Sequence, residues 1–419
     1  MTIWIVLETF IFSIINYIYF KRFFNFASVF IFMWCAVSVL SSFGFYGLYV
    51  PPSKTYIYIM ITIAAFEVSL LLFLKVRINI QTQTEVIKLN WRRVNFISIL
   101  CTVLIFPFAM KGMVLVLSEG FYRLRLSGFS NLLYSTSEKL ILMNVIQPLV
   151  LAISILSLIE LIENKKVRIS LVLSALNCLQ YIFVFGGRWI LLEFLLLAGI
   201  ILYDTYGVNI IKLIKNNKLI MIIITTLILL IAIITSQRSV GGGEGFLYNI
   251  YVYFVGSIHL FGVYISDPSK YALTSQDLLF GRAFFAGILE PLYLIVKFGG
   301  FNWKSGIEII NEVTQQFVFV SPATYMNNNV TMIYAFLRDF GFFGLIICPF
   351  ILGAYYSYIY MGKRQSSSIY RKGMYYYCLS IMPFLLFEWM PARLSIVLVP
   401  FCLYILTRRH FQSIIKIKR

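Results

Sequence analysis

Long apolar runs recur along this chain, and short clusters of positive charge separate them. A helix that crosses a bilayer needs about 20 consecutive apolar residues. Of the 419 residues, 60% are hydrophobic and only 12% are charged, whereas soluble domains average about 25% charged residues. An ordinary soluble enzyme is therefore excluded, and the sequence predicts an all-α, polytopic membrane protein. Eleven predicted spans cover residues 3–20, 26–48, 56–74, 94–117, 140–162, 169–185, 189–206, 219–235, 340–361, 374–390 and 394–407.

The basic clusters predict the orientation of these spans. With the N-terminus outside, six clusters fall on one side of the membrane and hold 22 of the 35 Lys and Arg, as cytoplasmic loops do. The net charge of +18 is thus explained by membrane orientation, and no nucleic-acid partner is expected. The chain divides into an N-terminal bundle (1–235), a large outer loop (236–337) and C-terminal spans with a basic cytoplasmic tail (338–419).

The outer loop is not uniformly polar. Its apolar runs at 246–265 and 283–296 are either two further spans or helices that lie in the membrane interface. The predicted total is therefore eleven to thirteen spans, and either choice leaves the orientation of the others unchanged. Loops of this length in a compact protein usually have a function, so we expect the active surface here.

Four arginines on the predicted outer side are candidate binding residues. Arg188 follows the sixth span and Arg238 follows the eighth, whereas Arg282 lies in the loop and Arg338 lies where the chain re-enters the membrane. The planar guanidinium group suits phosphate oxygens. The alternative is that these side chains extend to the lipid headgroups.

Polar side chains gather at the same membrane entrance. Asn329, Thr331 and Tyr334 precede Asp339, and such groups can bind sugar hydroxyls while the carboxylate accepts a proton. The alternative is a capped helix start. Two reserve candidates for a base lie in the loop, namely His259, which is otherwise a packed, hydrogen-bonded histidine, and Glu290.

Several motifs are absent from the sequence. It contains no nucleotide-binding Walker motif, no Asp-x-Asp pair and only two histidines, so we expect no metal site and no cofactor. Charged residues within the predicted spans are few and do not form the series of carboxylates typical of a proton-coupled pump. An ordinary secondary transporter is therefore disfavoured.

These features together resemble the O-antigen polymerase (Wzy-type) family over most of the chain. The resemblance is carried by Phe185-Gly186-Gly187-Arg188, by Arg238 at the next outer end and by the large outer loop. Its most specific part is Asn329-x-Thr331-x-x-Tyr334 followed by Asp339-Phe340-Gly341-x-x-Gly344. Related O-antigen ligases carry a histidine near the position of the three asparagines at 327–329, which favours a polymerase here.

The resemblance implies a metal-independent glycosyltransferase of the bacterial inner membrane that acts on its periplasmic face in lipopolysaccharide and other polysaccharide biosynthesis. Its partners would be undecaprenyl-diphosphate-linked oligosaccharide donor and acceptor, membrane lipid and a chain-length regulator protein. The arginines Arg188, Arg238 and Arg282 would neutralise the departing diphosphate. Asp339 is the first candidate for the base, with His259 and Glu290 in reserve.

Two alternative functions remain open at this stage. One is an O-antigen ligase, which transfers finished glycan to another acceptor. The other is a flippase or transporter of lipid-linked oligosaccharides, which would distribute polar residues through its central cavity. The sugar, the linkage and the oligomeric state are not encoded in any recognisable motif.

Overall fold

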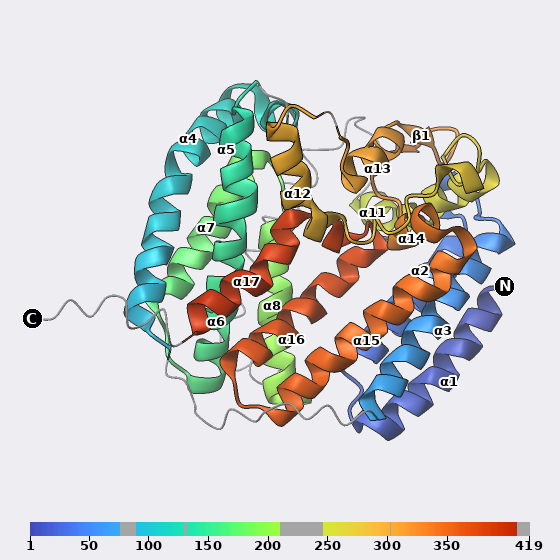
Figure 1. Ribbon diagram of the computed structural model, residues 1–419, viewed down its shortest axis with the longest axis horizontal. Coiled ribbons are helices and arrows are strands. Elements are labelled where there is room, and N and C mark those ends of the chain that lie inside the picture. Colours follow the sequence, from blue (N-terminus) through green and yellow to red (C-terminus); the bar gives the residue numbers. More distant parts are fainter. Residues whose placement is uncertain (76–88, 130–131, 210–245, 302, 409–419) are drawn as a thin grey trace, which may run out of the picture. The chain divides into compact units, whose positions relative to one another are not determined.

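A computed structural model describes residues 1–75, 89–129, 132–209, 246–301 and 303–408 (Figure 1). Contacts divide the chain into two compact units whose segments alternate along the sequence. Unit 1 comprises residues 1–82, 247–365 and 381–397, and unit 2 comprises residues 83–246, 366–380 and 398–419. The predicted division at residues 235 and 337 stays a prediction.

Unit 1 begins with a group of apolar helices. Figure 1 shows α1, α2 and α3 beside α15, which comes nearly 300 residues later in the chain. The two helices approach closely at Gly353 of α15, where an added Cβ would lie 2.4 Å from the Phe66 carbonyl oxygen of α3. Only a glycine allows the two backbones to pack this tightly. The helices are α1 (Thr2–Phe20), α2 (Phe26–Ser42), η1 (Phe45–Gly47), α3 (Ser53–Lys75) and α15 (Gly344–Gln365).

The remainder of unit 1 is built mostly from the predicted outer loop. It contains one long apolar helix, several short helices and a two-stranded antiparallel pair in which Val318 faces Met326. These elements are α11 (Phe246–Ser266), η4 (Ser275–Asp277), α12 (Ala286–Phe298), α13 (Gly306–Thr314), β1 (Val318–Phe319), β2 (Tyr325–Met326), α14 (Met332–Phe340), η5 (Gly341–Phe343), η6 (Met382–Leu386) and η7 (Met390–Ala392).

Unit 2 is a second helical group. Its α4 and α7 pack so closely that a Cβ at Gly112 would lie 1.7 Å from the Phe183 carbonyl oxygen. Its elements are α4 (Trp91–Phe129), α5 (Thr136–Ile141), the π-helical turn η2 (Leu142–Ile146), α6 (Gln147–Asn164), α7 (Ile169–Phe185), α8 (Trp189–Tyr206), η3 (Gly207–Asn209), α16 (Ile369–Ile381) and the second half of α17 (Leu394–Thr407).

The all-α prediction is confirmed for the described residues apart from the short strand pair. In that part of the chain, seven helical segments are long and apolar enough to cross a membrane. Three shorter apolar helices, at Phe26–Ser42, Ile169–Phe185 and Leu394–Thr407, accompany them. The seven segments are Thr2–Phe20, Ser53–Lys75, Trp91–Gly128, Thr136–Asn164, Trp189–Tyr206, Leu247–Ser266 and Met332–Gln365.

Two predictions about individual spans are corrected. The apolar run 374–390 is not one helix, because α16 ends at Ile381 and a 3₁₀ segment containing Pro383 follows; proline cannot donate the next helical hydrogen bond. Of the two apolar runs in the loop, α12 is too short to span, since its 13 residues extend over about 20 Å, so the two runs do not form a pair of further spans. The predicted eighth span, 219–235, lies outside the described residues.

Candidate functional site

Asp339 holds a turn of the predicted outer loop against α14. Its side chain is fully buried, and its carboxylate accepts N–H bonds from Ala283 at 2.9 Å and from Phe284 at 2.5 Å. The Phe280 amide donates to the Asp339 carbonyl at 3.0 Å. Both carboxylate oxygens thus accept charge-assisted bonds from the backbone. The structure shows a positioning role for Asp339, whereas its predicted role as a base stays a prediction.

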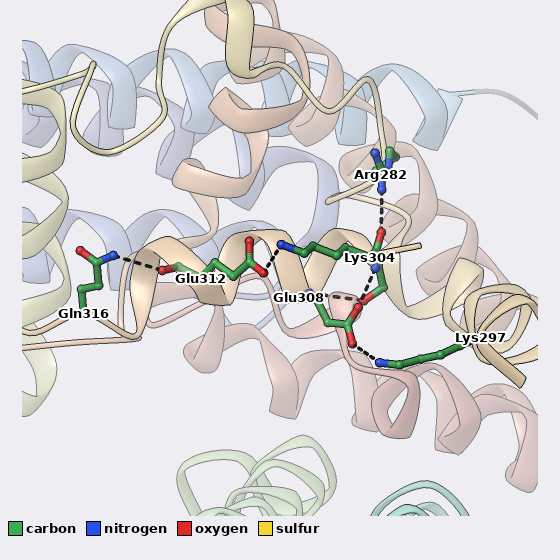
Figure 2. A network of polar contacts seen from close by, with 7 residues as sticks. Arg282, Lys297, Lys304, Glu308, Glu312 and Gln316 are labelled. Carbon is green, nitrogen blue, oxygen red and sulfur yellow. Dashed lines mark hydrogen bonds and ion pairs between the residues drawn. The ribbon is translucent and has the colours of Figure 1, made fainter. Parts of the chain in front are cut away.

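The turn that Asp339 holds carries Arg282. Its Nε donates to the Tyr293 hydroxyl at 3.2 Å, and its Nη2 donates to the Lys304 carbonyl at 2.6 Å. The guanidinium carbon lies 5.9 Å from the centroid of the Tyr293 ring. Figure 2 shows Arg282 directed at the backbone of Lys304. The side chain is half-buried, and these two bonds use two of the five N–H donors of a guanidinium.

Gly306 allows α13 to begin directly against Arg282. A Cβ at Gly306 would lie 1.9 Å from the Arg282 carbonyl oxygen, which is impossible without moving the backbone. Ser305 caps α13, because Glu308 accepts from the Ser305 amide at 2.9 Å and Ser305 Oγ accepts from the Glu308 amide at 3.3 Å. This reciprocal capping box fixes where the helix starts.

Glu290 lies one turn before Tyr293 on α12 and hydrogen-bonds to the Ser305 side chain. Its Oε2 is buried without a hydrogen-bond partner. Burial raises the pKa of Glu290, the negative charge of Glu308 raises it further, and Ser305 and Lys297 oppose the shift. A half-buried carboxyl with a raised pKa and an unused acceptor oxygen has the properties of a general base. Glu290 contacts Ser305 and Arg282 contacts Lys304, so both side chains reach the start of α13, and we call these residues the Arg282 cluster.

Two exposed ion pairs involve carboxylates of α13 (Figure 2). Lys297 binds Glu308 at 3.0 Å, and Lys304 binds Glu312 at 2.7 Å. The pKa of Glu308 lies below its usual value. Partial burial raises this pKa, but the hydrogen bonds from the Ser305 amide and the Lys297 side chain lower it by more. All four charged side chains are more than 40% exposed, so each pair contributes less than about 1 kcal/mol. Each of the two lysines is therefore paired with a carboxylate of α13.

Arg338 is only 3% exposed and contacts another part of the loop. Its Nη1 donates to the Ala272 carbonyl, and its Nε is buried without a partner. One turn earlier, Tyr334 donates to the Tyr271 carbonyl at 3.0 Å. The Tyr271 ring stacks on Tyr264 with centroids 4.0 Å apart. The two predicted binding residues of α14 thus hold the loop in place, and the Nε donor of Arg338 is unused.

His259, the other candidate for a base, contacts different residues from Asp339 and Glu290. It is 1% exposed, and its Nδ1 lies 2.7 Å from the Tyr49 carbonyl oxygen. Its Nε2 is buried without a partner. The Tyr49 amide in turn donates to the Val320 carbonyl at 2.8 Å. These contacts match the packed, hydrogen-bonded alternative, with His259 joining α11 to the segment after η1.

The asparagine segment precedes α14. The Asn329 amide donates to the Asn327 carbonyl at 2.7 Å, and the Asn329 side chain is half-buried. Thr331 occupies the N-cap position of α14 but makes no side-chain cap bond, and its buried hydroxyl has no partner. The structure therefore leaves the Thr331 hydroxyl unused, and the predicted sugar-binding role of both residues stays a prediction.

Arg188 belongs to unit 2. It is the N-cap residue of α8 and follows Gly186, whose φ is 60°. A Cβ at Gly186 would lie 3.3 Å from the Arg125 amide nitrogen of α4, so the exposed Arg125 lies beside the Arg188 turn. The sequence analysis missed Arg125 because it lies on a second helical segment of α4, between the break at Gly120 and Phe129. Arg238 lies outside the described residues.

An open apolar groove of about 620 Å³ lies in unit 1. Its lining is almost entirely apolar and includes two tyrosines and two phenylalanines. The residues come from the C-terminal end of α2, from η1 and from the first turns of α11. They are Leu40, Phe45, Tyr46, Leu247, Ile250, Tyr251, Phe254 and Val255.

Comparison with protein-family models, curated proteins and solved structures gave no match for this chain. Among the described residues, no group of three or more His, Cys, Asp or Glu side chains is arranged to hold a metal ion. The assignment of function therefore depends on the chemistry of the side chains.

Proposed function

We propose that the chain is a surface-polysaccharide polymerase that joins oligosaccharide repeat units carried on a lipid diphosphate. The observation that supports this proposal is that Glu290, with an unused buried oxygen, and Arg282 contact adjacent residues at the start of α13, namely Ser305 and Lys304. A base for an acceptor hydroxyl and a cation for a departing diphosphate are the two groups that such a transfer needs.

In the proposed reaction, a sugar hydroxyl of one lipid-linked repeat unit attacks the anomeric carbon of the donor glycan. Glu290 accepts the hydroxyl proton as the new carbon–oxygen bond forms. The bond between the anomeric carbon and the diphosphate breaks, and the diphosphate leaves with the electron pair. Arg282 offsets the charge that develops on the phosphate oxygens.

The remaining features of unit 1 are consistent with a lipid-linked substrate. Asp339 fixes the Arg282 turn, and Gly306 keeps α13 close to it. The apolar groove offers a surface for part of a long hydrocarbon chain. We place this cluster on the periplasmic face of the bacterial inner membrane, in accord with the charge asymmetry of the sequence.

The test uses a strain that lacks the gene and carries plasmid-borne variants, with the surface glycan sized on a gel. We expect Glu290→Gln to lower the polymerisation rate by about 100-fold or more, the usual effect of removing a general base, and to shorten the ladder. Arg282→Lys should also shorten it, because lysine lacks the two-pronged geometry. Glu312→Gln is the matched control in the same loop and should leave the ladder unchanged.

Protein levels of all variants are compared by immunoblot of membranes. A normal ladder from Glu290→Gln at wild-type protein level would contradict the assignment of the base. Full-length glycan that accumulates on its carrier lipid in the deletion strain would indicate a ligase instead.

A further inference from the structure

A pair of polar side chains is enclosed between α1 and α3, away from the Arg282 cluster. Glu67 of α3 and Asn16 of α1 are both fully buried. The Asn16 amide group donates to Glu67 Oε2 at 3.0 Å. The other two oxygens of the pair, Glu67 Oε1 and Asn16 Oδ1, are buried and have no hydrogen-bond partner. This pair has one hydrogen bond and two unused acceptors.

A second carboxyl group lies near this pair. Glu8 precedes Asn16 by eight residues on α1, is half-buried and interacts electrostatically with Glu67. Its Oε2 is also buried without a partner. Two carboxylates that interact in an apolar environment repel one another. Each would also lose the hydration of its charge.

The neighbouring helices offer no cation near the middle of α3. Neither α1 nor α2 contains Lys, Arg or His. The lysines of α3, Lys54 and Lys75, lie in its first and last turns, and Lys75 is eight residues from Glu67, or about 12 Å along the helix. In α15 the cations are Lys363 and Arg364 of the last turn. The charged residues of α14, Arg338 and Asp339, bind loop residues instead.

We propose that Glu67 is a proton-binding group in the membrane, with Asn16 as its partner and Glu8 as a second carboxyl that favours uptake of the proton. A protonated carboxyl has one O–H donor. A proton on Glu67 Oε1 supplies the donor that Asn16 Oδ1 lacks, so acid and amide form a pair with two hydrogen bonds. A Na⁺ ion would need more oxygen ligands than this pair offers.

Loss of this proton leaves a buried charge between α1 and α3. Nothing in the proposed transfer at Glu290 requires Glu67, so this site is independent of the proposed function. The pH on the side from which Glu67 exchanges its proton then controls how tightly α1 packs against α3.

Labelling with dicyclohexylcarbodiimide tests the proposal in native membranes. This apolar reagent adds to protonated carboxyl groups, with the carboxyl O–H adding across a carbon–nitrogen double bond, and the product is located by peptide mass spectrometry. We expect Glu67 to be labelled at about pH 6 and labelling to decline towards about pH 9. Glu119, exposed and paired to Arg123 at 3.1 Å, is the internal control and should stay unlabelled.

Two substitutions sharpen the test. Glu67→Gln resembles the protonated acid in shape and hydrogen bonding, so it should fold normally and lose the label. Glu8→Gln removes the repelling charge and should move the decline in Glu67 labelling to lower pH by about half a unit or more. The proposal would be overturned if Glu67 carried no label at any pH or if the decline in its labelling stayed at the same pH in Glu8→Gln. Protection of Glu67 from labelling by Na⁺ at constant ionic strength would also overturn it.

Discussion

Replacing Asp339 with asparagine separates a positioning role from a catalytic one. The substitution removes the charge from two backbone bonds, at 2.9 Å to Ala283 and 2.5 Å to Phe284, and turns one acceptor oxygen into a donor that faces an N–H group. A hydrogen bond to a charged group contributes about 1.5–3 kcal/mol, and a buried donor without a partner costs about 1–3 kcal/mol. We therefore expect Asp339→Asn to lower the free energy of unfolding by about 3–4 kcal/mol.

The assay compares unfolding of wild type and variant in mixed micelles of increasing denaturing-detergent content. Asp267→Asn is the matched control, because Asp267 is exposed and accepts a single backbone bond from Lys270 at 3.3 Å; we expect a change within about 0.5 kcal/mol. The Asp339 variant should also shorten the glycan ladder, since the Arg282 turn is no longer held. Wild-type stability combined with complete loss of polymer would refute this reasoning and make Asp339 the base.

Three further predictions concern the same unit. Glu308→Gln removes a negative charge that raises the pKa of Glu290. Because the base must be deprotonated, activity should then fall at a lower pH on acidification. A shift of this fall to higher pH in the pH–rate profile would contradict the prediction. Gly306→Ala would place a Cβ 1.9 Å from the Arg282 carbonyl oxygen and should shorten the ladder at normal protein level, whereas an unchanged ladder would count against the cluster. Gly353→Ala should lower the free energy of unfolding by about 1–3 kcal/mol because of its contact with α3, and unfolding at the wild-type detergent content would argue against that packing.

Composition and local pattern were sufficient to predict the helical elements. Runs of apolar residues place α3, α6 and α8 because a membrane helix satisfies all its backbone hydrogen bonds internally. The pattern could not define the helix ends. The helix α4 is interrupted at Gly120, close to the predicted span end at 117, and a second helical segment runs on to Phe129. The run 374–390 is interrupted at Pro383.

The candidate site was only partly predictable. Arg282, Glu290 and Asp339 were recognised one by one as costly groups at a membrane boundary. Their arrangement depends on contacts between residues far apart in sequence, such as the bond from Ala283 to Asp339, for which no local pattern exists. The Ser305-x-x-Glu308 capping box was a readable signal that would have placed the start of α13.

If this chain extends a glycan by joining lipid-linked repeat units, its loss should change the size of the surface glycan, which is measured on a gel in a strain lacking the gene. We expect the ladder to collapse to a single repeat unit attached to its normal anchor and a plasmid copy to restore it. A ladder that is unchanged by the deletion would show that the chain is not this polymerase.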